Sequence, residues 1–108
     1  MLNNAEQILQ KEDRKFKTVT SKAWGEEVRL VTLNAAQRGE LAKISSDKLF
    51  NCWLVAFSVV NEDGVRIFAD SHVNKLAEKD GANIEELCIE ILKLNGMADE
   101  EFEDIKKN

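Results

Sequence analysis

Residues 49–70 read LFNCWLVAFSVVNEDGVRIFAD, in which a long apolar stretch runs into a short polar step. Apolar side chains recur in the first part at spacings of three and four residues, which places them on one face of a helix. They are Leu49, Cys52, Trp53, Ala56, Phe57 and Val60. The opposite flank is apolar as well, so this helix is expected at the centre of the fold. We predict that it follows Ser46 and runs to Val60.

The polar step that follows has two interpretations, a cation-binding loop and a tight turn. A calcium loop needs oxygen ligands at alternating positions and a glutamate at its twelfth position. Here Asn61, Glu62 and Asp63 are contiguous, and residues 65–68 after Gly64 offer no further ligands. The sequence therefore predicts a turn at Asp63–Gly64 and no metal site.

Beyond this turn we expect a short extended piece whose Ile67 and Phe68 return to the core. Asp70 is placed to cap a helix that ends at Gly81, because aspartate favours the N-cap position. A second helix is predicted to open at Asn83 and to end at Gly96, a plausible left-handed terminator. A last short acidic helix is expected from about residue 99.

The region before residue 49 contains both the helical spacing of three and four residues and the strict alternation of a β-strand. Asn4 with Gln7 predicts a short capped helix, and Asn34 with Gln37 predicts another. Between them, residues 15–33 alternate apolar and polar side chains on both sides of a Trp-Gly step, which is typical of a β-hairpin. The predicted fold class is α+β: a mostly helical single domain, 1–108, with an N-terminal β-hairpin (about 15–33) followed by four to five helices (about 35–107).

Composition narrows the class of protein. The chain has 108 residues, 44% hydrophobic and 32% charged, with a net charge of −5. Nine basic and seven acidic residues in 1–60 give +2, and six and thirteen in 61–108 give −7. An acidic protein is a poor ligand for nucleic acid. Residues 53–60, the longest apolar run, are too short to cross a membrane, and no signal peptide is expected at the charged N-terminal region.

The sequence holds little material for catalysis. His72 is the only histidine, and its neighbours Asp70 and Ser71 share one helical turn, so they cannot form a triad with it. Cys52 and Cys88 lack the spacing of a metal site and are expected to be buried, reduced thiols. We therefore predict no enzymatic activity, no cofactor and no metal.

Four residues are candidates for protein binding: Trp24, Met97, Phe102 and Ile105. Trp24, beside a glycine at the hairpin tip, is expected either to pack over the helices or to meet a partner. The acidic terminal helix carries few apolar side chains and must dock on its own core or on a partner. Trp53, in contrast, is expected in the core of the domain.

The order of these elements resembles the tail assembly chaperones of long-tailed bacteriophages and prophages. The resemblance covers nearly the whole chain, through AWGEEVRLVTL (23–33), NAAQRGELAKI (34–44), LVAFSVVNEDGVRIFAD (54–70) and LKLNGMADEEFEDIKKN (92–108). These are a hairpin with a Trp-Gly step, a polar capped helix, an apolar helix entering an Asp-Gly turn, and a Leu-rich helix with an acidic end.

The resemblance implies a non-enzymatic chaperone in the host bacterial cytoplasm. Such proteins are thought to coat the helical tape measure protein, to hand it to major tail tube subunits, and to be absent from the finished virion. The implied partners are therefore the tape measure protein, the tail tube protein and further copies of the chain, with neither nucleic acid nor membrane. The alternative function is a small DNA-binding transcriptional regulator or antitoxin-like protein, which would bind DNA with steep salt dependence.

Overall fold

The computed structural model describes residues 1–97. The last predicted helix, with Phe102 and Ile105, lies outside the described residues. In chain order the elements are α1 (Ala5–Leu9), β1 (Phe16–Ser21), β2 (Glu26–Val31), α2 (Ala35–Lys43), α3 (Phe50–Ser58), β3 (Val59–Val60), the 3-10 helix η1 (Asp70–His72), α4 (Val73–Leu76) and α5 (Gly81–Leu94). The α+β class, with a hairpin followed by helices, is confirmed.

The strands form one antiparallel sheet in the order β1-β2-β3. The predicted hairpin is confirmed, with Phe16 opposite Val31 and Ser21 opposite Glu26. Gly25 closes the connection at φ +70°, a left-handed conformation that favours glycine, and its N–H donates to the Ser21 carbonyl at 2.8 Å. Residues within the connection itself therefore fix the turn that joins β1 to β2.

The central helix is shorter than its periodicity predicts, because it ends at Ser58 rather than Val60. Val59 and Val60 turn extended and pair with Leu30 and Arg29 of β2. β-Branched valines are stiff side chains that suit a pleated strand. The free edge of β2 also provides hydrogen-bonding partners for the backbone of Val59 and Val60. These two residues therefore form a third strand instead of extending the helix.

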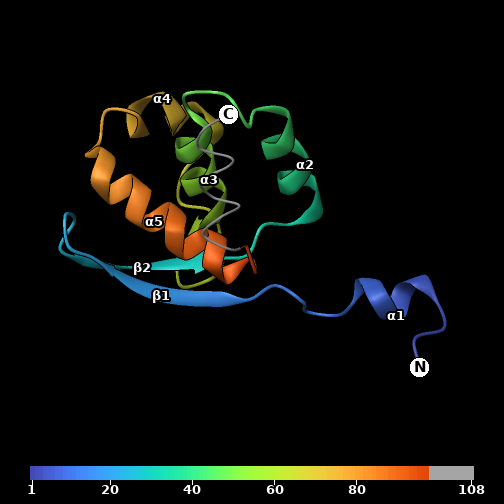
Figure 1. Cartoon of the computed structure of the whole chain (residues 1–108). Coiled ribbons are helices and arrows are strands. Elements are labelled where there is room, and N and C mark those ends of the chain that lie inside the picture. The colour runs from blue at the N-terminus through green and yellow to red at the C-terminus, as the bar shows by residue number, and fades with distance from the viewer. Residues whose placement is uncertain (98–108) are drawn as a thin grey trace.

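The core lies between the sheet and the helices on one of its faces. Figure 1 shows α5 crossing the sheet, with α3 beside it and α2 and α4 further out. Leu30 of β2, Leu54 of α3 and Ile91 of α5 are all fully buried, so each layer contributes to the same core. Cys52 and Cys88 are buried and free, as predicted.

The polar step after β3 is a turn, as predicted. Gly64 has φ +79°, and the side-chain oxygen of Asn61 accepts backbone N–H groups within the turn at 2.9 and 3.0 Å. Phe68 packs against the core, but the prediction for Ile67 is wrong, because its side chain is 52% exposed. The chain bends at Ile67 and Phe68, just after the bridge between Arg66 and Val60, so the expected extended piece does not continue and only Phe68 faces the core.

Local capping signals near the N-terminal side of the chain are confirmed. Asn4 accepts the N–H of Gln7 at the start of α1, and Asn34 forms a capping box with Gln37 at the start of α2. Gly96, at φ +76°, follows the end of α5 as the predicted left-handed terminator.

Two other cap predictions are wrong. Asp70 caps no helix: its carboxylate pairs with Arg66 at 3.0 Å. α5 begins at Gly81, where a helix end was expected, and its cap is Asp80, which accepts the N–H of Asn83 at 3.1 Å. Asn83 itself is buried and accepts a hydrogen bond from the Ser21 hydroxyl at 2.8 Å. A contact with a strand 62 residues away therefore replaces its local cap role.

Candidate protein-binding surface

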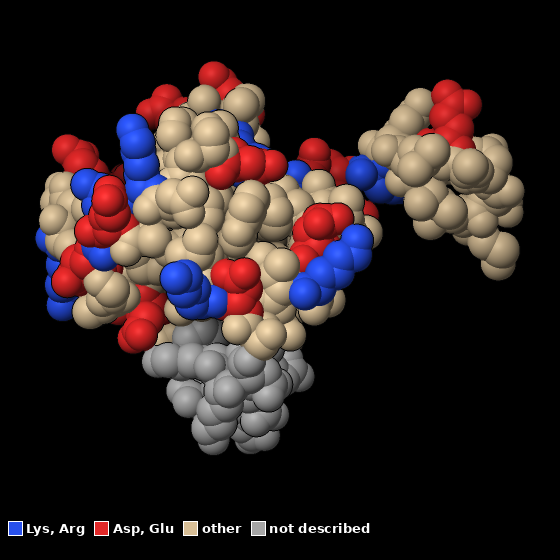
Figure 2. All heavy atoms as spheres, turned by 90° about the horizontal axis from the view of Figure 1, so that it is seen from above, with Lys and Arg blue, Asp and Glu red and all other residues tan. Residues whose placement is uncertain are grey.

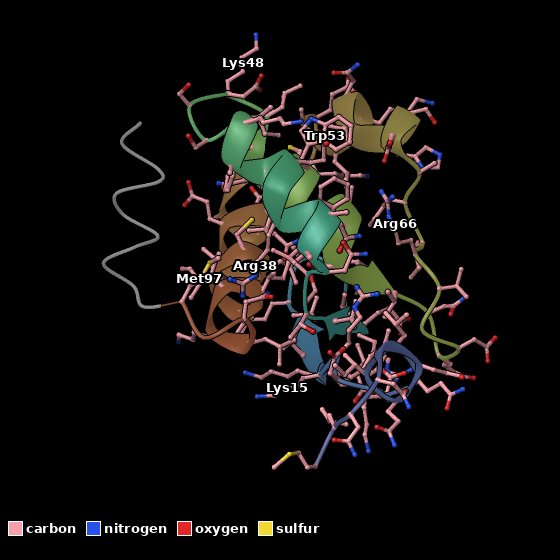
Figure 3. The ribbon with its side chains drawn as sticks, turned by 90° about the vertical axis from the view of Figure 1, so that its right-hand side faces the viewer. Lys15, Arg38, Lys48, Trp53, Arg66 and Met97 are labelled. Atoms are coloured by element: carbon pink, nitrogen blue, oxygen red, sulfur yellow. The ribbon has the colours of Figure 1, made fainter. Side chains whose placement is uncertain are left out.

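Helix α2 buries little of its surface against the rest of the domain. Of its residues only Leu41 is buried, and Gly39 lies in its interior. Figure 3 shows Arg38 and Met97 on one side of this helix, and Trp53 and Arg66 on the other. A hollow lies on each side of α2, and these two hollows are the candidate binding surfaces.

We call the first hollow the apolar groove. It lies between α2, α3 and α5 and has a volume of about 460 Å³, a size that accommodates several apolar side chains. Its lining is Leu33, Leu41, Ala42, Phe50, Leu54, Leu92 and Met97, with Arg38 and Ser45 as its polar members. Met97, a predicted binding residue, is therefore placed in a built apolar surface. Whether it binds a partner stays a prediction.

A polar latch holds one end of this groove. The Arg38 guanidinium donates to the Asn95 carbonyl at 2.9 Å, and the Asn95 side chain accepts the N–H of Leu33 at 2.9 Å. The Asn95 amide nitrogen also donates to the Ile91 carbonyl at 2.7 Å. The segment before α2 is thus tied to the end of α5, and the groove keeps its width there although α2 buries little.

We call the second hollow the aromatic hollow, with a volume of about 360 Å³. Its lining is Asn34, Ala36, Gln37, Glu40, Ile44, Trp53, Phe57, Arg66 and Asp70. Trp53 packs against the core, as expected, but it is only half-buried. Its ring lies 5.6 Å from that of Phe57, and the Arg66 guanidinium sits 5.0 Å from the Phe57 ring.

The aromatic hollow could not be read from the sequence. Helical spacing places Trp53 on the apolar face but does not show that α2 leaves part of the indole uncovered. Arg66 is held by Asp70 and by the Ala56 carbonyl, to which its Nε donates at 2.9 Å. The hollow therefore presents a rigid aromatic and guanidinium surface, and those side chains carry much of the binding energy in protein interfaces.

The other sequence candidates lie apart from the two hollows. Trp24 is half-buried at the hairpin tip and packs against the core. Its backbone N–H donates to the Ser21 hydroxyl at 3.2 Å. The packing interpretation of Trp24 thus holds, and a partner role for its exposed part stays a prediction. Phe102 and Ile105 lie outside the described residues.

His72 has a local structural role. Its Nδ1 accepts the N–H of Ala69 at 2.9 Å, which closes the first turn of η1. Within residues 1–97 no group of three or more histidine, cysteine, aspartate or glutamate side chains is placed to hold a metal ion. In the same part of the chain, no helix is long and apolar enough to cross a membrane.

A DNA-binding regulator would need an exposed recognition helix within 70–94, and α5 does not have that form. It buries one face against α3 and the sheet through Ile84, Leu87, Cys88, Ile91 and Leu92. Its remaining side chains include Glu85, Glu86 and Glu90, which phosphates would repel. Helix α5 is therefore a poor match to a recognition helix, and the DNA-binding alternative stays a prediction.

The N-terminal segment stands away from the domain. Every residue from Met1 to Asp13 is exposed, and α1 buries none of its residues. Figure 1 shows α1 beyond the end of β1, and Figure 2 shows it as a mostly uncharged lobe beside the charged body. Leu2 and Ile8 are each 52% exposed, and Leu9 is 81% exposed. We call residues 1–10 the arm.

The chain is similar to a known protein in its fold. No protein-family model matches the chain, and no curated protein matches it. A solved structure, described as that of the bacteriophage HK97 tail assembly chaperone, superimposes with a TM-score of 0.69 over 86% of this chain and 94% of that one. This chain has the fold of the HK97 tail assembly chaperone. The two sequences are 17% identical, so the likeness is one of architecture.

The resemblance to tail assembly chaperones that the sequence predicts is confirmed at the level of the fold. The superposition covers most of both chains, so the likeness concerns the domain as a whole.

Proposed function

We propose that the protein is a phage tail assembly chaperone. It binds the tape measure protein, helps to recruit tail tube subunits, and is absent from the finished virion. The observation that carries the proposal is the fold shared with the HK97 tail assembly chaperone over nearly the whole of both chains. The role is non-enzymatic and is performed in the host bacterial cytoplasm.

The proposed role is to cover apolar surface on the tape measure protein. A long helical protein exposes apolar stripes before a tube encloses it, and such stripes aggregate unless they are covered. A small domain with a shallow aromatic or apolar hollow covers one short part of a stripe weakly. Many copies acting together bind with high avidity and still release the chain when the tube polymerises.

The aromatic hollow is the surface that we assign to this contact. Trp53 and Phe57 supply apolar area, and Arg66 supplies a cation beside them, a combination that recurs in the energetic centres of interfaces. Trp24, Met97, Phe102 and Ile105 remain proposed protein-binding residues, with Met97 placed in the apolar groove.

Three alanines on α2 allow a matched test, because all are exposed and accept the same substitution. Ala36 lines the aromatic hollow, Ala42 lines the apolar groove, and Ala35 lines neither. The tape measure protein of the same phage is co-expressed with each variant, and its soluble fraction is measured. We expect the wild type and Ala35→Glu to solubilise it and Ala36→Glu to fail. A wild-type chain that leaves the tape measure protein insoluble would overturn the proposed function.

A further inference from the structure

The arm is a short amphipathic element without a covering surface. Its helix has five residues and is ordered by local bonds: Asn4 accepts the N–H of Gln7 at 2.9 Å, and Gln7 accepts that of Asn3 at 2.8 Å. A helix of this length is not stable alone in water. Its large exposed apolar side chains are Met1, Leu2, Ile8 and Leu9. Such an arm gains most of its stability by docking on an apolar surface.

The base of the arm is fixed in direction. Arg14 donates from Nε and Nη2 to the Thr32 carbonyl, at 3.0 and 2.7 Å, and the Lys15 N–H donates to the Thr32 hydroxyl at 3.1 Å. The chain is therefore anchored just before β1, and the arm projects beyond the strand rather than over the helices (Figure 1). Its apolar side chains therefore stay exposed, away from the core of their own domain.

The apolar groove has the chemistry to receive the arm. Seven of its nine lining residues are apolar, and its one charged member is Arg38. The arm carries a single charged side chain, Glu6, on the same helix as Ile8 and Leu9. The two surfaces are thus complementary both in apolar character and in the sign of their charges.

We propose that the arm of one copy docks in the apolar groove of a second copy. Each copy then offers one arm and one groove, so the contact is heterologous and links copies head to tail into a ring or a row. The inference identifies how the chain associates with itself. It rests on the proposed function only for its purpose, because a row of copies suits a long helical partner.

The first experiment measures self-association of the purified full-length chain by sedimentation velocity over a wide concentration range. Ile8→Gln combined with Leu9→Gln removes apolar area from a helix that buries nothing, so the fold is unaffected. Ala42→Glu places a carboxylate in the groove at an exposed helical position. We expect the wild type to associate and each variant to do so at least about tenfold more weakly.

Two matched controls accompany these variants. Val65→Gln removes an apolar side chain that is 59% exposed on the turn after β3, away from the arm. Ala35→Glu repeats the groove substitution outside the groove. Both are expected to associate like the wild type. Association that survives the arm substitutions, for example through the free edge of β1, would overturn the proposal, as would a wild type that stays monomeric throughout.

Mixing the two defective chains gives the sharper test. An arm variant retains its groove and a groove variant retains its arm, so the mixture regains one intact contact and forms a one-to-one heterodimer that grows no further. Pairing of two arms, or docking of an arm or of residues 98–108 in their own groove, predicts no such heterodimer. Absence of the heterodimer would overturn the proposal.

Failure of this inference is distinguishable from failure of the proposed function. Self-association is measured on the chaperone alone, and solubilisation of the tape measure protein is measured by co-expression. An arm variant that is monomeric supports the inference whether or not it still solubilises the tape measure protein, because loss of avidity by itself weakens that contact. A wild type that associates through the arm but leaves the tape measure protein insoluble overturns the proposed function alone.

Discussion

Arg38 of α2 donates to the carbonyl of Asn95, 57 residues further along the chain, at 2.9 Å. Asn95 also bonds Leu33 and Ile91, so one side chain joins the start of α2 to the end of α5. This latch explains how a helix with a single buried residue, Leu41, keeps its place beside two hollows.

Removal of the latch is expected to destabilise the fold. Asn95→Ala removes the side-chain acceptor of the Leu33 N–H and the side-chain donor to the Ile91 carbonyl, while the bond from Arg38 to the Asn95 backbone carbonyl remains. We expect the free energy of unfolding to fall by about 1–3 kcal/mol. Urea denaturation measures the change. Asn74→Ala, at an exposed position of α4, is the control and should change it by less than about 0.5 kcal/mol. Equal effects of the two substitutions would show that the latch contributes nothing.

The same substitution at two glycines should act with opposite signs. Gly64→Ala forces a side chain into φ +79°, and we expect a loss of about 1–2 kcal/mol. Gly39 lies inside α2 with open space around it, so Gly39→Ala should stabilise the protein by up to about 1 kcal/mol. Chemical denaturation of both variants decides this, and a stabilising Gly64→Ala would contradict the turn geometry.

The ion pair between Lys17 and Glu90 joins β1 to α5 and makes stability depend on pH. The hydrogen bond from Lys17 is the largest cause that lowers the pKa of Glu90 below its usual value of 4.5. Burial, the next in size, raises this pKa, and the nearby charges of Lys17 and Lys93 lower it further. The stabilisation is therefore present above pH 4.5 and is lost as the pH falls through the pKa of the folded state.

Glu90→Gln tests this pair. Because both side chains are partly exposed, we expect a loss of less than about 1 kcal/mol at neutral pH, and no difference from the wild type at a pH well below 4.5. Glu40→Gln, which breaks the more exposed pair with Lys43, is the matched control and should have a smaller effect. A Glu90→Gln deficit that persists unchanged in acid would exclude the ion pair as its cause.

The two thiols should be chemically silent in the folded protein. Burial raises the pKa of Cys88 well above its usual value, and burial also raises that of Cys52. Because the thiolate is the reactive form, both remain protonated and shielded at mildly alkaline pH. A colorimetric thiol reagent should label them only as fast as the protein opens, and in urea both should react at once. Rapid labelling without denaturant would contradict the burial of these residues.

Much of the fold could be predicted because its signals are local. The alternation of residues 15–33, the caps at Asn4 and Asn34 and the glycine at the Asp63–Gly64 turn each act within a few residues. The candidate site could be predicted only in part. Met97 was singled out from the sequence, but its groove is built from segments as distant as Leu33 and Leu92.

The hairpin, the central apolar helix and the acidic composition of the chain follow from the sequence alone. These follow from periodicity, turn chemistry and composition, which need no knowledge of distant neighbours. Three other features depend on contacts between distant segments: Val59 and Val60 complete a sheet, Asn83 bonds Ser21 instead of capping a helix, and α2 leaves Trp53 partly uncovered. Each of these residues contacts a segment that is distant in the chain. Packing and hydrogen bonding with that segment outweigh the helix or strand preference of the local sequence.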